Sequence, residues 1–168
     1  MQTQFEKLVL NPNFENVRVW AHERNLIEQG DVQTQSIKLF EEFGELCGSI
    51  LKDKRQVIID SIGDMIVVMI NICEIKDGEH LKMEEQTFYV NTNSEDKTTN
   101  TCLSFIGHNI FLLANGVSNI LNPINSILSL LIDLCERFDL DVSECLDFAY
   151  NEIKDRTGKM VDGNFVKD

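Results

Sequence analysis

The sequence is poor in basic residues. Fifteen Lys and Arg stand against 28 Asp and Glu in 168 residues, which gives a formal net charge of −13. Proteins that bind nucleic acid non-specifically need basic patches, so this balance argues against nucleic acid as a partner. An anionic substrate would need metal ions to bridge it to so acidic a protein.

Long apolar runs and targeting signals are also missing. No stretch reaches the roughly 18 uncharged apolar residues of a membrane span. The first ten residues lack the basic start and the long apolar run of a signal peptide. We therefore expect a cytoplasmic protein without a membrane partner. Its length and its 43% hydrophobic content suit a single domain over residues 1–168.

Clusters of Cys and His, the usual ligands of zinc, are absent as well. The cysteines lack CxxC spacing and mostly follow apolar helical faces, so we expect buried free thiols in a reducing compartment; they are Cys47, Cys73, Cys102, Cys135 and Cys145. None of His22, His80 and His108 has a Glu three residues before it, the spacing that a di-iron helical bundle needs.

Helical periodicity dominates what is present, and it predicts an all-α bundle. Asn11-Pro12 is a helix start, and the first helix should run to about Glu28. Asp31 should cap a second helix, which ends near 52–55, and a third helix should follow to about Ile75.

The second half of the chain predicts three further helices and a long polar stretch. Helical spacing returns at 101–115 before Gly116, at 122–138 after Asn122-Pro123, and at 141–154 with Asp141 and Glu144 as a capping box. Residues 1–10 read as a loose lead-in, and the tail after Lys154 reads as irregular. Residues 77–130 look like an insertion whose only strand-like piece is 87–90.

Acidic side chains line one face of the second predicted helix. Lys38, Glu41, Glu42 and Glu45 fall at i, i+3, i+4 and i+7, which places them on one stripe. A solvated face of an amphipathic helix is the alternative interpretation for this stripe alone.

The third predicted helix carries Asp60, Asp64 and Asn71 on one face of an otherwise apolar segment, which indicates a buried helix. Burying carboxylates without partners costs several kcal/mol each, and the segment has no basic residue between Gln56 and Ile75. If the two helices pack side by side, three Glu and two Asp converge. Such an oxygen-rich site is of the kind that Mg²⁺ or Mn²⁺ prefers.

Further candidate site residues have two interpretations each. Trp20 is either a core residue or a ligand contact. Lys38 either pairs with Glu41 or Glu42, or contacts a phosphate. Lys154, Arg156 and Lys159 are either ordinary charge beyond a helix C-terminus or a phosphate clamp.

Four runs of the sequence match one known family. The runs WAHERNLI, QSIKLFEEFGEL, DSIGDMIVV and AYNEIKDRTGKMVDGNFVKD resemble the MazG-like nucleotide pyrophosphohydrolases, particularly the short single-domain type carried by phages. These proteins belong to the all-α NTP pyrophosphatase superfamily. The resemblance covers about residues 14–76 and 131–168.

The resemblance implies Mg²⁺-dependent hydrolysis, with Mn²⁺ as an alternative, of a nucleoside triphosphate to a nucleoside monophosphate and pyrophosphate. Glu42 and Glu45 would be metal ligands, and Glu41 would hold a further ion or orient water. Asp64 matches the final Asp of the family's ExxD element. The chain departs from that element because Ser61 occupies the Glu position, and Asp60 is the candidate substitute ligand.

The remaining expectations concern the substrate and partners. Lys38, Lys154, Arg156 and Lys159 would contact the phosphates, while Trp20 and Asn71 would line the nucleoside side. A homodimer or homotetramer is expected, with the Leu-rich and Ile-rich run from Ile120 to Leu134 at its interface. The alternatives are a helical module that senses a nucleotide without turnover and a structural bundle whose acids face water.

Overall fold

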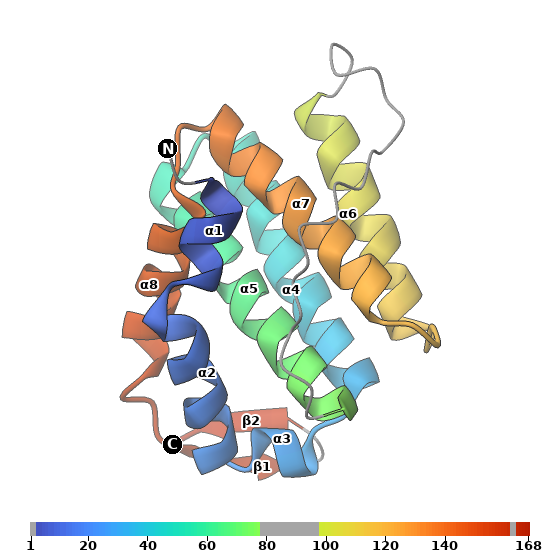
Figure 1. The fold of residues 1–168 in the computed structure, drawn as a ribbon, viewed down its shortest axis with the longest axis vertical. Coiled ribbons are helices and arrows are strands. Elements are labelled where there is room, and N and C mark those ends of the chain that lie inside the picture. Colours follow the sequence, from blue (N-terminus) through green and yellow to red (C-terminus); the bar gives the residue numbers. More distant parts are fainter. Residues whose placement is uncertain (1–2, 78–97, 162–163) are drawn as a thin grey trace.

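The chain folds as an all-α protein, as the periodicity predicts. The structure is a computed structural model that describes residues 3–77, 98–161 and 164–168. Its described residues form eight helices and one β-hairpin (Figure 1). The elements are α1 Gln4–Val9, α2 Pro12–Glu23, α3 Leu26–Gln29, α4 Val32–Leu51, α5 Arg55–Asp77, α6 Thr99–Ala114, α7 Leu121–Arg137, α8 Val142–Ile153, β1 Gly158–Val161 and β2 Asn164–Lys167.

Helix α5 is the centre of the fold, and α4 lies along it (Figure 1). A tight turn joins the two, in which Asp53 takes a positive φ of 51°. Side chains all around α5 are buried, among them Ile62, Met65 and Ile72 at 0% exposure. Helices α2, α3, α7 and α8 also pack against α5. Burial on every side is what the continuous apolar sequence of this segment predicts.

Helices α6 and α7 pack on each other, and α6 also packs on α4. Ile106, Ile110 and Leu113 of α6 are fully buried, so this helix contributes to the core. That residues 77–130 are an insertion stays a prediction. The strand-like piece at 87–90 lies outside the described residues.

The run that was expected to form an oligomer interface is inside the chain's own core. Most apolar side chains of α7 are at most 2% exposed, namely Ile124, Ile127, Leu128, Leu130, Leu131 and Leu134. Their high hydrophobicity is explained by contacts with α5, α6 and α8.

Helix caps explain where several elements begin. Asn11, Asp31 and Asp141 each accept a backbone N–H in the first turn of α2, α4 and α8, as predicted. Within the predicted loose lead-in, Gln4–Val9 is helical, because Thr3 and Glu6 form a capping box for α1. The first predicted helix is broken, since Asn25 adopts a left-handed conformation (φ 56°) that separates α2 from α3.

Two segments of the tail, which was expected to be irregular, are paired strands. Strands β1 and β2 pair antiparallel with Lys159 opposite Val166 and Met160 opposite Phe165. A two-stranded hairpin is marginal by itself. Here Phe165 anchors it, with its ring against Trp20 at a centroid distance of 5.8 Å. This long-range contact between α2 and the tail is not visible in the local sequence.

The fold also bears on the expected lack of a membrane span and on the state of the cysteines. No helix in the described ranges is long and apolar enough to cross a membrane. None of the five cysteines forms a disulfide bond, and four of them are buried and Cys47 partly so, as the sequence predicts for buried thiols.

Candidate functional site

The acidic stripe of α4 is formed as predicted, but its members differ in exposure. Glu42 is buried, with 5% of its surface exposed, whereas Glu41 and Glu45 are exposed. Lys38 reaches Glu41 at 2.9 Å and Glu42 at 2.6 Å. Burial disfavours the charge of Lys38, yet its hydrogen bonds to Glu42 and Glu41 outweigh that effect and raise its pKa. Lys38 thus forms the ion pairs of one interpretation, and nothing in this geometry tests its phosphate role.

The α5 side of the site holds Asp60 and Asp64, with unsatisfied polar atoms around them. Asp60 Oδ1 is buried and has no hydrogen-bond partner, and the same is true of Ser61 Oγ. Buried oxygen atoms without a partner are rare in folded proteins, and each needs an explanation. Asp60 therefore has a carboxylate oxygen that the protein itself leaves unsatisfied.

Electrostatics shows that the two helices bring their acids together. Burial is the main cause that raises the pKa of Asp64 to about 7, and the charges of Glu42 and Asp60 add to it. Burial also raises the pKa of Asp60, with further contributions from Glu152, Glu42 and Glu45. Positive charge from Arg156 opposes both shifts. Of the five acids predicted to converge, Glu42, Glu45, Asp60 and Asp64 are therefore close enough for their charges to interact.

The side chains do not form a finished coordination sphere. Among the described residues, no group of three or more His, Cys, Asp or Glu side chains is arranged to hold a metal ion. Like charges repel one another, and Glu42 is turned toward Lys38 at 2.6 Å. The donor set nevertheless fits Mg²⁺ or Mn²⁺, because every candidate ligand is a carboxylate oxygen and Asp60 Oδ1 has no partner.

Trp20 is a core residue, which is one of its two predicted interpretations. It is 7% exposed, and its indole N–H donates to the carbonyl oxygen of Ile153 at 2.8 Å. The guanidinium of Arg24 lies 4.9 Å from its ring centroid. Trp20 does not fit the expected contact with the nucleoside, because its one polar atom is already hydrogen-bonded and its ring is covered.

Asn71 lies on the same side of α5 as Asp64, two turns further on. It is 3% exposed, and its Oδ1 accepts no hydrogen bond. A buried amide oxygen with no donor is available to a ligand that brings one. Its assignment to the nucleoside side stays a prediction.

The three basic residues near the C-terminus separate in space. The positive charge of Arg156 lowers the pKa of Asp60 and Asp64, and its guanidinium forms an ion pair of 3.6 Å with Glu152. Lys154 is exposed and donates to Asn151, while Lys159 is exposed on the hairpin. Of the three residues predicted to clamp a phosphate, Arg156 is the one whose charge acts on the acids.

Glu152 is a charged residue that sequence reasoning did not connect with the acids. It belongs to α8, far along the chain from the other acids, and among the charged groups it contributes most to the raised pKa of Asp60. Spacing along a single helix gave no signal for it, because the other acids lie on α4 and α5.

A second group of charges lies at the other end of α5, with Glu74 buried and His22 and Glu28 partly exposed. Arg18 binds both carboxylate oxygens of Glu74, at 2.9 and 3.0 Å. His22 bridges Glu74 at 3.1 Å and Glu28 at 2.6 Å. The hydrogen bond to Glu28 and then that to Glu74 raise the pKa of His22. This network joins α2, α3 and α5, and its charges are paired.

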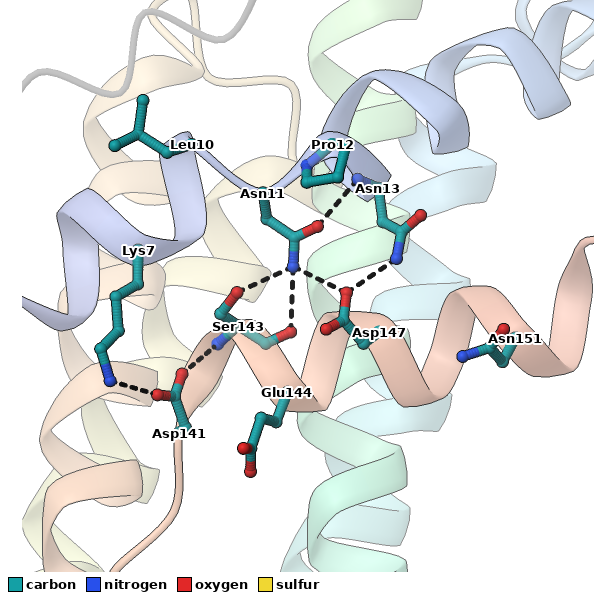
Figure 2. A pocket seen from close by; sticks show the side chains of 10 residues that line it. All are labelled: Lys7, Leu10, Asn11, Pro12, Asn13, Asp141, Ser143, Glu144, Asp147 and Asn151. Carbon is teal, nitrogen blue, oxygen red and sulfur yellow. Dashed lines mark hydrogen bonds and ion pairs between the residues drawn. The ribbon is translucent and has the colours of Figure 1, made fainter.

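A polar hollow of about 600 Å³ lies away from the acids, where the α1–α2 connection meets α8 (Figure 2). In Figure 2, Asn11 points at Ser143 and Asp147, and Lys7 points at Asp141. None of the predicted site residues lines it. Its polar groups mainly satisfy one another, so it joins α2 to α8.

Comparison with known proteins gives one informative similarity. No family model matches the chain, and no solved structure matches it. The chain is similar to a protein of Haemophilus phage HP1 (strain HP1c1), described as an uncharacterized 18.2 kDa protein in the rep-hol intergenic region. The two are 56% identical over 55 residues, which are 33% of this chain and 34% of the phage protein. The match spans about a third of that relative's length.

Proposed function

We propose that the chain is a metal-dependent nucleoside triphosphate pyrophosphohydrolase of the MazG-like type. It would convert a ribo- or deoxyribonucleoside triphosphate and water to the monophosphate and pyrophosphate. The convergence of Glu42, Asp60 and Asp64 from two packed helices carries this proposal. Their charges are mutually repulsive and partly buried, so a cation is the natural complement.

Divalent ions held by Glu42, Glu45, Asp60 and Asp64 would neutralise phosphate charge and activate a water molecule. The chain's own residues have separate tasks around them. Glu41 is exposed beside Glu42, where it can accept a proton or orient water. Lys38 and Arg156 supply the positive charge near the acids and would bind phosphate oxygens. Asn71 would serve the nucleoside.

The decisive assay separates pyrophosphate from orthophosphate. A panel of NTPs and dNTPs with Mg²⁺ should yield pyrophosphate and a monophosphate, because attack at the α phosphorus releases the terminal two phosphates together. Release of orthophosphate would instead indicate attack at the γ phosphorus. No release of either product from any nucleotide would contradict the proposed activity.

Metal binding can be measured without turnover. Mn²⁺ or Mg²⁺ at millimolar concentration should raise the melting temperature, because only the folded chain assembles the acids. Glu42→Gln should remove most of that shift, whereas Glu144→Gln is a control that removes one exposed charge from α8. An unchanged melting curve of the wild-type protein would argue against a metal site.

A second function is favoured by one observation, the buried Ser61 at the position where the family has Glu. A chain that lost this carboxylate could bind a nucleotide without hydrolysing it. The two functions differ in outcome: a sensor would bind nucleotide with metal in calorimetry and release no pyrophosphate.

The wider setting is also a proposal. The similarity to a phage HP1 protein supports a phage-encoded protein that acts in the host cytoplasm. The net charge of −13 supports small anionic substrates brought by cations, and not nucleic acid, as the partners. A homodimer or homotetramer remains the expected assembly.

A further inference from the structure

His22 of α2 has a carboxylate beside each of its two ring nitrogens. Its Nδ1 lies 2.6 Å from Oε1 of Glu28 in α3, and its Nε2 lies 3.1 Å from Oε1 of Glu74 in α5. An ionised carboxylate only accepts hydrogen bonds, so both nitrogens must donate if both bonds are to exist. A neutral imidazole has one N–H, whereas an imidazolium has two. The bridge from α3 to α5 therefore depends on the protonated ring.

The two carboxylates differ in how firmly they are held. The side chain of Glu74 is 7% exposed, and Arg18 binds both of its oxygens, at 2.9 and 3.0 Å. Glu28 is 48% exposed, so it can turn into water. When the ring becomes neutral, one nitrogen keeps a proton and the other presents a lone pair to a carboxylate. The repulsion is smallest if Nε2 keeps the proton, because Glu74 is fixed and Glu28 can move away.

Helix α3 depends on its tertiary contacts, since four residues are too few for a stable helix in isolation. Leu26 is buried at its start. At its end, a Cβ added to Gly30 would lie 3.1 Å from Cδ1 of Ile75 in α5. The bond between His22 and Glu28 adds a polar connection from α3 to α2. Its loss should leave α3 held by apolar contacts and more easily opened.

The charges around His22 favour its protonated form. Hydrogen bonds to Glu28 and then to Glu74 raise its pKa, and burial opposes them. Arg18, one turn earlier on α2, is directed away to Glu74 and Glu15, at 2.9 and 2.8 Å. The bridge is therefore complete below pH 6.5, the ordinary pKa of the ring, and is lost as pH rises through the raised pKa.

We propose that His22 is a proton-dependent latch: its imidazolium ties α3 to α2 and α5, and loss of the Nδ1 proton to water releases Glu28 while Glu74 stays bound. The latch acts at the entry to α4, because α3 leads through Gly30 directly to Asp31, which caps that helix. It does not depend on the proposed function, since none of its residues belongs to the acid site.

The ring tautomer provides the first test, measured on the full chain by NMR from the ¹⁵N shifts of the His22 ring. Above its pKa the neutral ring should carry its proton on Nε2. A proton on Nδ1 would preserve the bond to Glu28 and overturn the latch. Glu23→Gln is the matched control, because it removes an exposed carboxylate next to His22 that pairs with Arg24 instead. The tautomer should be the same in this variant.

Hydrogen exchange measures the release of α3 itself. The amides of Gln29 and Gly30 bond to the carbonyls of Asn25 and Leu26. Corrected for the intrinsic effect of pH on exchange, their protection should fall roughly two- to fivefold as His22 deprotonates, the size expected for a half-exposed ion pair.

The Glu28→Gln variant distinguishes the latch from other effects of pH. Its amide can accept from the charged ring and donate to the neutral one, so the fall in α3 protection should disappear. Glu23→Gln should keep the fall. The latch is overturned by unchanged α3 protection in the wild type, or by an equal fall in the wild type and Glu28→Gln. A fall of the same size in the amides of α7 would also overturn it, because this would show a change in global stability.

Discussion

Asp64 is the residue where burial and charge conflict most in the acid site. Its pKa is about 7 in the fold against an ordinary 3.8, so the folded chain binds this proton more tightly than the unfolded chain does. The free energy of unfolding should therefore fall as pH rises from about 4 to 7 and stay low above that. The effect is on the order of a few kcal/mol.

Asp64→Asn should relieve this repulsion. At pH 8 the metal-free variant should be more stable than the wild type, and the two should converge toward pH 4. Its response to Mg²⁺ and any turnover should be lost. Urea unfolding at several pH values measures this, and a variant that keeps the wild-type pH slope would show that Asp64 is not the titrating group.

Kinetic measurements on variants should distinguish the roles of the acids. Glu42→Gln, Glu45→Gln and Asp64→Asn should each lose most activity and weaken metal binding. Glu41 is exposed and pairs with Lys38 at 2.9 Å, so Glu41→Gln should lower kcat more than metal affinity. Asp60→Asn should be as damaging as Asp64→Asn if Asp60 is a ligand. Near-normal activity of Asp60→Asn would make it a bystander.

His22 should give the free energy of unfolding a second dependence on pH. Because Glu28 and Glu74 raise its pKa above 6.5, its contribution to stability is complete below 6.5 and is lost as pH rises through the raised value. An NMR titration should place the pKa of His22 above that of an ordinary histidine. Glu28→Gln should lower the pKa of His22, because it removes the carboxylate of the 2.6 Å ion pair. An identical titration of His22 in both proteins would contradict the bridge.

At the scale of elements, the contact between α5 and α8 depends on one glycine. Gly63→Ala should force the helices apart, since its Cβ would overlap the backbone of Cys145. We expect a loss of about 1–3 kcal/mol in the free energy of unfolding and weaker metal binding.

Gly44 of α4 is the matched control, because an added Cβ meets nothing within 4 Å there. Gly44→Ala should instead stabilise the helix, by roughly 0.5–1 kcal/mol. Denaturant unfolding compares the two directly. A Gly63→Ala variant as stable as Gly44→Ala would mean that the helices can separate without cost.

At the scale of the whole molecule, the expected oligomer needs a new interface, since the apolar face of α7 is already buried. The described residues leave Ile37 and Leu51 of α4 62% and 84% exposed, and Phe111 of α6 55% exposed. Helices α4 and α6 pack side by side. We predict that a homo-oligomer uses this α4–α6 surface.

Light scattering at micromolar concentration should give at least twice the 19.2 kDa of one chain. Leu51→Asp should lower that mass, whereas Val19→Asp, which changes another exposed apolar residue on α2, should not. A monomeric wild type would contradict the oligomer, and a mass unaffected by Leu51→Asp would contradict this surface.

Much of the fold was determined by the sequence alone, because it depends on local interactions. The 3.6-residue periodicity identified most helices, and Asn11, Asp31 and Asp141 cap their helices as predicted. The two acid lines on α4 and α5 also follow from spacing along one helix. Their convergence was predictable because a short turn leaves two consecutive helices side by side.

Only the tertiary structure decided which residues join the acids and which do not. The charges of Glu152 and Arg156 act on the pKa of Asp60 because α8 packs on α5, a contact between distant parts of the chain that Gly63 permits. Trp20 serves the core because Phe165 and the carbonyl of Ile153 meet it. Spacing along a helix predicts the face of a residue, but the neighbour that covers that face depends on how the whole chain packs.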